Sequence, residues 1–518
     1  METPEAPVPA FDLAHHVARH QAEQRVREQQ QGLGRPIISG KLDDHQFVAV
    51  RNKLYASKTW KTFPDFLGDY IKEVLGSDWG NAEIAKPLND RHVIMQWYDA
   101  YCRYQQAHIK TPGEVTQFDT TGVVACYLGL AYALYLIDHN VELQERLVRR
   151  LKDPGNFQGA YYELIVASAL IRAGFELTLE DETDPRAKHC EFAAVSKQSG
   201  KKYWVEAKMR AVRGLLGRTE RDGTANPKPT SHMIQHLNGA LAKPAADDDR
   251  LIFIDLNTEM DVMVDEDHRP PFMKLATDRL ERYEVDTLAE GVTAYVFITN
   301  LPFHRSLDGT ANLAVAPFGL GMPDFNRPGY FRHSERYRQE QKHADALRIA
   351  DAFSSYLKLP STFDGSLPSE AFGRQSSRVQ IGETYFFDDV GDKGTLGTVT
   401  SVAVIEAEKA AYVAITTPQQ GSQILVQTMS AAELADYLAH PDAYFGRVVP
   451  VSKPAKTPYE LFEFFMRAHK SWTREKLLQR IAGWPNFATL NAMSDDDLRA
   501  EYCEGLTASV GAFKPNAA

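Results

Sequence analysis

The pattern of apolar and polar positions divides the chain into segments of different character. Residues 1–45 start Pro-rich and continue into the polar stretch HHVARHQAEQRVREQQQ. This stretch could form a solvated helix, but it lacks a regular apolar period, so residues 1–45 are expected to be a flexible tail outside any core. Over residues 46–150, apolar residues recur at three- and four-residue spacing in VRNKLYASKTW, FPDFLGDYIKEVLG and RHVIMQWYDAYCRYQQAH. This spacing predicts a helical domain.

The pattern changes over residues 151–305, where helical and strand-like stretches alternate. The expected order is helix, three strands, helix, strand, helix, strand, at 159–173, 175–180, 189–197, 203–209, 232–242, 251–256, 274–289 and 293–299. Gly174 is expected to end the first helix, and Ser231 to cap the second. A Gly-containing turn at 198–201 joins the second and third strands as a hairpin.

The remaining sequence predicts three further segments. Residues 306–375 form an irregular and helical linker, 376–453 alternate like a small all-β domain, and 454–518 are helical. The expected fold class is therefore multidomain α/β, with an αβββαβ core between an N-terminal helical domain and the two C-terminal segments.

Composition narrows the class of protein. With 518 residues, 43% hydrophobic residues and a formal net charge of −11, the chain has enough apolar material for several cores, which excludes a mostly disordered protein. The four cysteines include no CxxC pair, so a zinc ribbon is not expected and a reducing, cytoplasmic setting fits best. The uncharged run 122–137 is shorter than the roughly 18–20 residues of a membrane helix, so we expect a buried core helix and no membrane association.

The residues that suggest chemistry lie on the expected hairpin. Glu206 and Lys208 share one face of their strand because side chains alternate, and Glu191 starts the paired strand. Two converging carboxylates, together with the backbone carbonyl of Ala207, can hold a hard divalent cation such as Mg²⁺ or Mn²⁺. Lys208 would then orient a water or stabilise charge on a phosphate.

Two helical residues are further candidates for the same site. Glu163, in the helix before the strands, can present a third carboxylate, and Gln235, in the helix after them, is a neutral partner for water or phosphate. Either residue could equally be an ordinary polar side chain on a helix surface.

This arrangement resembles the PD-(D/E)XK nuclease superfamily, whose fold is the restriction endonuclease-like one. The resemblance depends on Glu163, Glu191 and the E-x-K of residues 206–208, and it covers about 150 of the 518 residues. It implies metal-dependent hydrolysis of phosphodiester bonds. Glu191 stands where the superfamily usually has Asp, and Asp184 is a rival for that position in the preceding loop.

Local charge favours a polyanionic ligand. Residues 186–228 contain eleven basic and four acidic residues, a net charge of +7 within an acidic chain. The candidate phosphate contacts are Lys201, Lys202, Arg210, Arg213 and Arg218.

Two hypotheses follow from the sequence. The first is a Mg²⁺-dependent nuclease acting on DNA, with a place in genome defence or repair suggested by analogy alone. The second is a protein that retains the fold without turnover and works as a scaffold or nucleic-acid binder through its flanking domains. Nothing in the sequence requires a homodimer, and the flanking domains could bind a protein partner.

Overall fold

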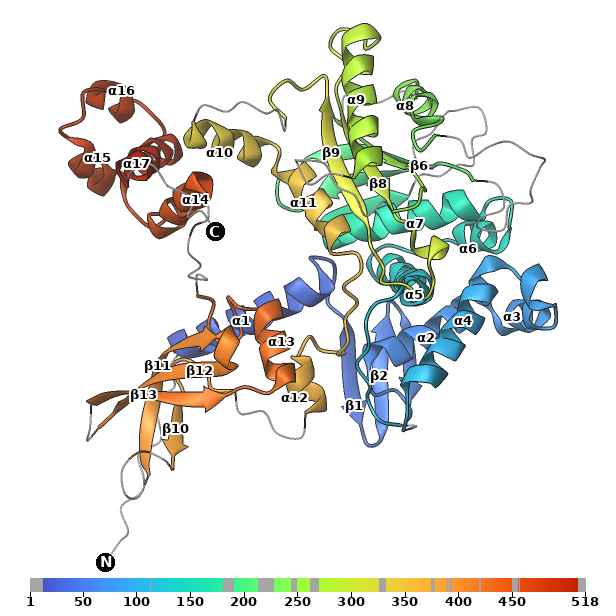
Figure 1. Cartoon of the computed structure of the whole chain (residues 1–518), viewed down its shortest axis with the longest axis horizontal. Helices are drawn as coiled ribbons and strands as arrows, with labels where there is room; N and C mark the ends of the chain where they lie inside the picture. The colour runs from blue at the N-terminus through green and yellow to red at the C-terminus, as the bar shows by residue number, and fades with distance from the viewer. Residues whose placement is uncertain are drawn as a thin grey trace, which may run out of the picture.

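A computed structural model gives the fold of most of the chain. It describes residues 13–111, 113–179, 191–212, 228–243, 249–260, 270–325, 332–373, 378–388, 390, 394–418, 421–449, 455 and 457–510. Within these ranges the protein is a multidomain α/β molecule with three separate sheets and many helices, as the sequence predicts at this level (Figure 1).

A mixed sheet of six strands forms the centre of the α/β unit. Its strands lie in the spatial order in which they occur in the chain: β4 (Phe175–Leu179), β5 (Phe192–Ser196), β6 (Lys202–Met209), β7 (Asp249–Asp255), β8 (Ala294–Asn300) and β9 (Ala314–Leu320). Strands β4, β5 and β6 form an antiparallel meander, whereas β6, β7 and β8 run parallel and β9 returns antiparallel. The parallel pairs require crossover connections, which α8 (Met233–Leu241) and α9 (Pro271–Asp286) supply.

Helices cover both faces of this sheet. On one face, α7 (Phe157–Arg172) and α5 (Gly122–Asn140) share a core with Tyr203, Val205 and Ala207 of β6. On the other face, α8 and α9 pack on the apolar side chains of β7 and β8. The alternation along β6 therefore directs Glu206 and Lys208 to the side of α8, opposite the α7 core.

The expected core helix at 122–137 is present as α5. Its length and composition would let it cross a membrane, but 94% of its most apolar stretch is buried by the rest of the chain. Gly122 lies at its start, where an added Cβ would clash with the backbone carbonyl oxygen of Ser306. The helix is therefore enclosed by the fold along nearly its whole length.

The N-terminal part differs from the expected all-helical domain. Residues of the expected tail and first helix instead form a three-stranded antiparallel sheet of β1 (Ile38–Leu42), β2 (His45–Val50) and β3 (Lys53–Ser57). In β2, buried and half-buried residues alternate with period two, and Arg51 adopts a positive φ of 52° in the turn to β3. The expected helices follow as α2 (Phe63–Leu75), α4 (Val93–His108) and α6 (Glu145–Lys152). Helix α3 (Ser77–Ile84) is an additional one that the sequence pattern did not indicate.

Residues 13–31 form helix α1 (Leu13–Gln31), as the sequence allowed, but this helix packs against the β domain and is not a solvated tail (Figure 1). Ala22 and Val26 are buried in the core of that domain, while Arg25 and Gln29 donate hydrogen bonds to Asp442. Two buried apolar positions in nineteen residues are too few to produce a helical period in the sequence, which explains the difference.

The expected linker contains a strand as well as the helices that the sequence predicts. Besides β9, it contains α10 (His333–Lys342), α11 (Ala344–Ser354) and α12 (Pro368–Phe372). Ile349 and Phe353 of α11 are buried in the same core as α7. The α/β unit therefore extends beyond residue 305.

The two C-terminal segments match the sequence in type. The β domain is a sheet of β10 (Thr384–Phe387), β11 (Thr395–Ile405), β12 (Ala410–Thr417) and β13 (Gly421–Thr428), followed by α13 (Ala431–Ala439). The last helices are α14 (Pro458–Ala468), α15 (Arg474–Ile481), α16 (Phe487–Asn491) and α17 (Asp495–Ser509). Their core includes Tyr337 of α10, so the helical segment recruits part of the linker.

Candidate active site

The structure brings the two strand carboxylates together around one lysine. Glu191 directly precedes β5, and its N–H donates to the carbonyl oxygen of Val205 in β6. The Nζ atom of Lys208 lies 2.7 Å from Oε1 of Glu191 and 2.7 Å from Oε1 of Glu206. The hairpin therefore positions these three side chains as the sequence predicts.

A second lysine, which sequence reasoning missed, completes the group. Lys243 follows the end of α8, and its Nζ lies 2.7 Å from Oε2 of Glu206. The four side chains form a row of alternating charge in the order Glu191, Lys208, Glu206, Lys243. Lys243 is 37 residues from Glu206 in the sequence, so no local pattern could indicate the contact.

Burial makes these charges interact strongly. The side chain of Glu206 is only 3% exposed, and an ionised carboxylate in such a place needs compensating partners. Burial alone lowers the pKa of Lys208, but the charges of Glu191 and Glu206 and their hydrogen bonds outweigh it, so the pKa is raised overall. Lys208 is therefore a stable ammonium group at neutral pH.

Glu163, in α7, pairs with an arginine of the neighbouring helix α6. Both of its carboxylate oxygens accept hydrogen bonds from the guanidinium of Arg150 in α6, each at 2.6 Å. The pKa of Glu163 is raised, first by burial and further by the charge of Glu191, while Arg150 and Lys208 oppose the increase. The printed contact of Glu163 is thus the one with Arg150, and its inclusion in the site stays a prediction.

Of the residues on α8, His236 and not the predicted Gln235 is affected by the charge of Lys208. Gln235 is exposed, and its Oε1 lies 3.1 Å from Nδ1 of His232, so no contact joins it to the carboxylates. His236 has a lowered pKa, caused first by burial and then by the positive charge of Lys208. Helix α8 starts after His232, which has a positive φ of 64°, rather than with the expected Ser231 cap.

The candidate phosphate-binding residues differ in their exposure to solvent. Lys201 and Lys202 are exposed on the hairpin, and the ammonium of Lys202 lies 4.3 Å from the ring centroid of Trp204. Arg210 is buried, and it donates hydrogen bonds to the backbone carbonyls of Leu256 and Asn257. The expectation that Arg210 contacts phosphate is therefore corrected, because its guanidinium is bound to the backbone that follows β7. Arg213 and Arg218 lie outside the described residues.

The distances to Lys208 limit how far apart the two strand carboxylates lie. One oxygen of Glu191 and one of Glu206 lie 2.7 Å from the same nitrogen, so they are separated by at most twice that distance. Oε1 of Glu206 is buried and has no hydrogen-bond partner beyond this ion pair. Among the residues that the structure describes, no three His, Cys, Asp or Glu side chains gather as metal ligands. In the structure Lys208 lies between the two carboxylates, and a divalent cation at this point stays a prediction.

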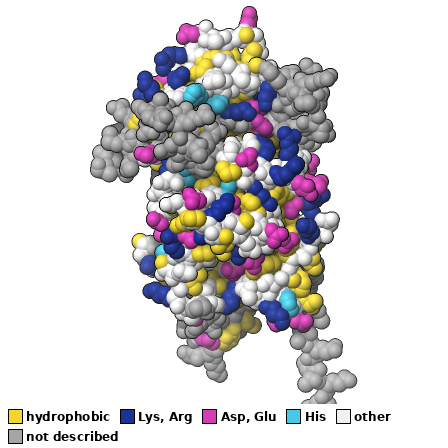
Figure 2. All heavy atoms as spheres, turned by 90° about the vertical axis from the view of Figure 1, so that its right-hand side faces the viewer, with side chains coloured by type: hydrophobic (Ala, Val, Ile, Leu, Met, Phe, Trp, Pro, Cys, Tyr) yellow, Lys and Arg dark blue, Asp and Glu magenta, His cyan; other side chains and the backbone are white. Residues whose placement is uncertain are grey.

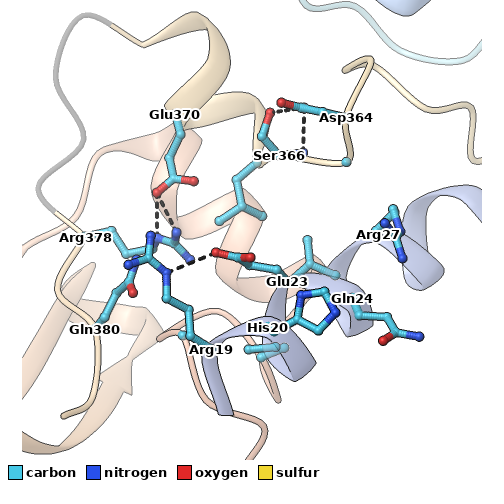
Figure 3. Close-up of a pocket in the computed structure, with 16 residues that line it drawn as sticks. Arg19, His20, Glu23, Gln24, Arg27, Asp364, Ser366, Glu370, Arg378 and Gln380 are labelled. Atoms are coloured by element: carbon cyan, nitrogen blue, oxygen red, sulfur yellow. Dashed lines mark hydrogen bonds and ion pairs between the residues drawn. The ribbon is translucent and has the colours of Figure 1, made fainter. Parts of the chain in front are cut away.

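Another pocket of the described structure lies away from the candidate site and lacks its carboxylate and lysine pairs. A pocket of about 390 Å³ lies between α1 and the β domain (Figure 3). There, Arg19 pairs with Glu23, and Arg378 pairs with Glu370. Arg19 and Arg378 are thus directed to neighbouring carboxylates.

Comparison with known proteins gives no relative: no family model matches the chain, and neither a curated protein nor a solved structure is significantly similar to it. The geometry of the site is therefore the basis for any function assigned to the chain.

Proposed function

We propose that the protein is a nuclease that hydrolyses phosphodiester bonds of nucleic acid, with DNA as its expected substrate and Mg²⁺ or Mn²⁺ as its cofactor. The observation that carries the proposal is the convergence of Glu191, Glu206 and Lys208 at one point of the β5–β6 hairpin. Two carboxylates and an ammonium are the groups that a metal-assisted attack on phosphate requires.

The order of elements supports the same interpretation. Helix α7, the antiparallel meander β4–β6, helix α8 and the parallel strand β7 follow one another as in the αβββαβ core that the sequence resemblance implies. The acidic residues lie on the second and third strands of this core.

Each side chain has a distinct part in the reaction. Glu191 and Glu206 would hold the cation, with the backbone carbonyl of Ala207 as a further ligand, and the cation would supply an acidified water and neutralise phosphate charge. Lys208, held as an ammonium, binds a non-bridging oxygen of the phosphate and stabilises its growing charge. Glu163 remains fixed by Arg150 at the edge of the site.

Hydrolysis adds one water across the phosphodiester. The water oxygen forms a bond to phosphorus, the bond from phosphorus to one sugar oxygen breaks, and that sugar oxygen receives a proton. Burial of Glu206 excludes bulk water from one side of the reacting phosphate.

A second candidate is a nucleic-acid-binding protein that uses this fold without turnover. The observation that favours it is the ion-pair row itself, in which Lys208 and Lys243 already neutralise Glu206. A cation would have to displace Lys208 from between the carboxylates.

Cleavage assays separate the two candidates. We expect the full-length protein to cut supercoiled plasmid, single-stranded DNA or RNA when Mg²⁺ or Mn²⁺ is present, and to stop cutting when EDTA is added. Intact substrate in all three arms with either metal, together with binding in a gel-shift assay, would establish the second candidate instead.

A further inference from the structure

One edge of the β-domain sheet lacks the features that usually protect an open strand. In the order β10–β11–β12–β13, strand β13 has a neighbouring strand on one side only among the described residues. Its sequence, GSQILVQT, contains no charged residue and no proline, and it pairs with β12 from Gly421 to Thr428 without a bulge. Natural proteins protect exposed edges with charges, prolines, bulges or a covering segment, because an open edge is a template for another strand. The edge of β13 therefore suits pairing with a further strand.

The side chains of β13 are apolar on the face that the rest of the chain leaves open. Leu425 packs against the core of the β domain, whereas its neighbours Ile424 and Val426 are 70% and 61% exposed. Helices α1 and α13 lie on the core side of this sheet (Figure 1). Two large aliphatic side chains thus remain in solvent on an edge strand, which marks an interaction surface.

The sequence of β13 is nearly the same when it is read in either direction. Residues 422–428, SQILVQT, are centred on Leu425, and each residue on one side has a counterpart of the same kind on the other: a β-branched aliphatic residue, a glutamine and a small hydroxyl residue. Antiparallel strands run in opposite directions, so each strand meets the other in reverse order. A second copy of β13 therefore presents a matching side chain at every position.

This symmetry defines the register of the pair. When Leu425 lies opposite Leu425 of a second copy, Ile424 lies opposite Val426 of that copy on the exposed face, and the reverse pair forms on the other side of the axis. Cross-strand pairs of β-branched aliphatic residues stabilise a sheet. Because β13 is uncharged, no like charges meet across the axis, although the chain as a whole has a net charge of −11.

A second copy of the chain fits this edge better than a foreign strand. Pairing of one edge with itself is an isologous contact, which closes after two copies and leaves neither β13 edge open. The opposite edge of the sheet, β10, is the short segment Thr384–Phe387 and has no such internal symmetry. A charged peptide would find no countercharge on β13.

We propose that the protein forms a two-fold symmetric dimer in which β13 pairs antiparallel with β13 of a second copy, centred on Leu425, so that the two sheets become one continuous sheet. The inference concerns the β domain and does not depend on the proposed nuclease function.

Sedimentation velocity of the full-length protein over a concentration series tests the dimer. For wild type we expect a species with the mass of two chains whose share increases with concentration. Ile424→Lys/Val426→Lys should raise the dissociation constant about tenfold or more, because like charges then lie opposite each other in both symmetric pairs. Both positions are exposed in the single chain, so the circular dichroism spectrum should remain that of wild type.

A second variant tests the register itself. In Ile424→Lys/Val426→Glu each introduced lysine lies opposite an introduced glutamate of the other copy, so this protein should still dimerise. Monomers at the concentrations where wild type is dimeric would contradict the register and overturn the inference.

A matched control separates the edge from the exposed face. Phe386→Lys/Ile405→Lys adds the same charge at exposed apolar positions of β10 and β11, away from β13, and should leave the dissociation constant unchanged. Equal weakening in this control would show that copies associate by another surface and would overturn the inference, as would a wild-type protein that is monomeric at every concentration. Cleavage of nucleic acid is measured separately, and neither result decides the other.

Discussion

Lys208 is the residue on which the chemistry of the site depends most. Its ammonium is held between two carboxylates, and they keep its pKa raised despite burial. A lysine in this state serves as a fixed positive charge rather than as a proton acceptor. The same reasoning applies to Glu206, whose buried charge requires both Lys208 and Lys243.

The contact between Arg150 and Glu163 gives a first prediction. Arg150→Met should leave a carboxylate that is 13% exposed without its two hydrogen bonds, and lower the free energy of unfolding by about 3 kcal/mol. Urea denaturation at pH 7 measures the loss. The double variant Arg150→Met/Glu163→Gln should recover much of it, because the unpaired charge is then gone. Additive losses in the double variant would contradict this account of the pair.

His92 provides a prediction about pH. Burial lowers its pKa in the folded protein to about 4, from 6.5. Between these values the unfolded chain binds more protons, so stability is fully present above pH 6.5 and decreases as the pH falls towards 4. This residue should account for roughly 3 kcal/mol of that decrease at pH 4.

A matched variant isolates the effect of His92. Its Nδ1 accepts a hydrogen bond from the N–H of Ile94 at the start of α4, and Asn can accept the same bond without titrating. The stability of His92→Asn should depend less on pH between 6.5 and 4, as measured by denaturation at several pH values. An identical pH profile for the two proteins would exclude His92 as the source.

At the residue level, local patterns predicted part of the site. Strand alternation placed Glu206 and Lys208 on one face, and the Gly200 turn brought Glu191 to them. Arg150 and Lys243 come from other elements, at a sequence distance of 13 and 37 residues from their partners. Their approach depends on how α6 and α8 pack, which a one-dimensional pattern does not contain. The assigned roles of all these residues remain predictions.

At the scale of elements, segments with a strong apolar period were predicted correctly, whereas a segment with an ambiguous period was not. The apolar strands β7 and β8 and the amphipathic helix α2 lie close to their expected ranges. Strands β2 and β3 occupy a stretch in which the apolar residues fitted a helical spacing as well as an alternating one. Packing of Val48 and Val50 into the main core decided between the two.

The glycine at the start of α5 gives a prediction at this scale. Gly122→Ala should destabilise the protein by about 2–3 kcal/mol, because the new methyl group meets rigid backbone carbonyls of residues 303 and 306. The control is Gly68→Ala in α2, where an added Cβ meets nothing within 4 Å and should increase stability by about 0.5–1 kcal/mol. Thermal unfolding of both variants measures the difference. Destabilisation of similar size in both would contradict the proposed close approach.

At the scale of the whole molecule, the α/β unit shares its core with the N-terminal part of the chain. Its main core reaches from the N-terminal sheet through α5 and α7 to α11, so these parts are expected to unfold together. The β domain and the C-terminal helices each have a core of their own. In Figure 1 they lie on the side of the molecule away from α6 and α8.

The central claim is that the carboxylates and the ammonium of the β5–β6 hairpin form a metal-dependent hydrolytic centre. Its most direct test is the initial rate of plasmid cleavage in Mg²⁺ for wild type, Glu206→Gln and Lys208→Met, with Glu176→Gln and Lys274→Met as exposed controls. We expect a decrease of about 100-fold or more in the two site variants and wild-type rates in the controls. Cleavage that persists in both site variants, or that wild type performs equally well in EDTA, would contradict it.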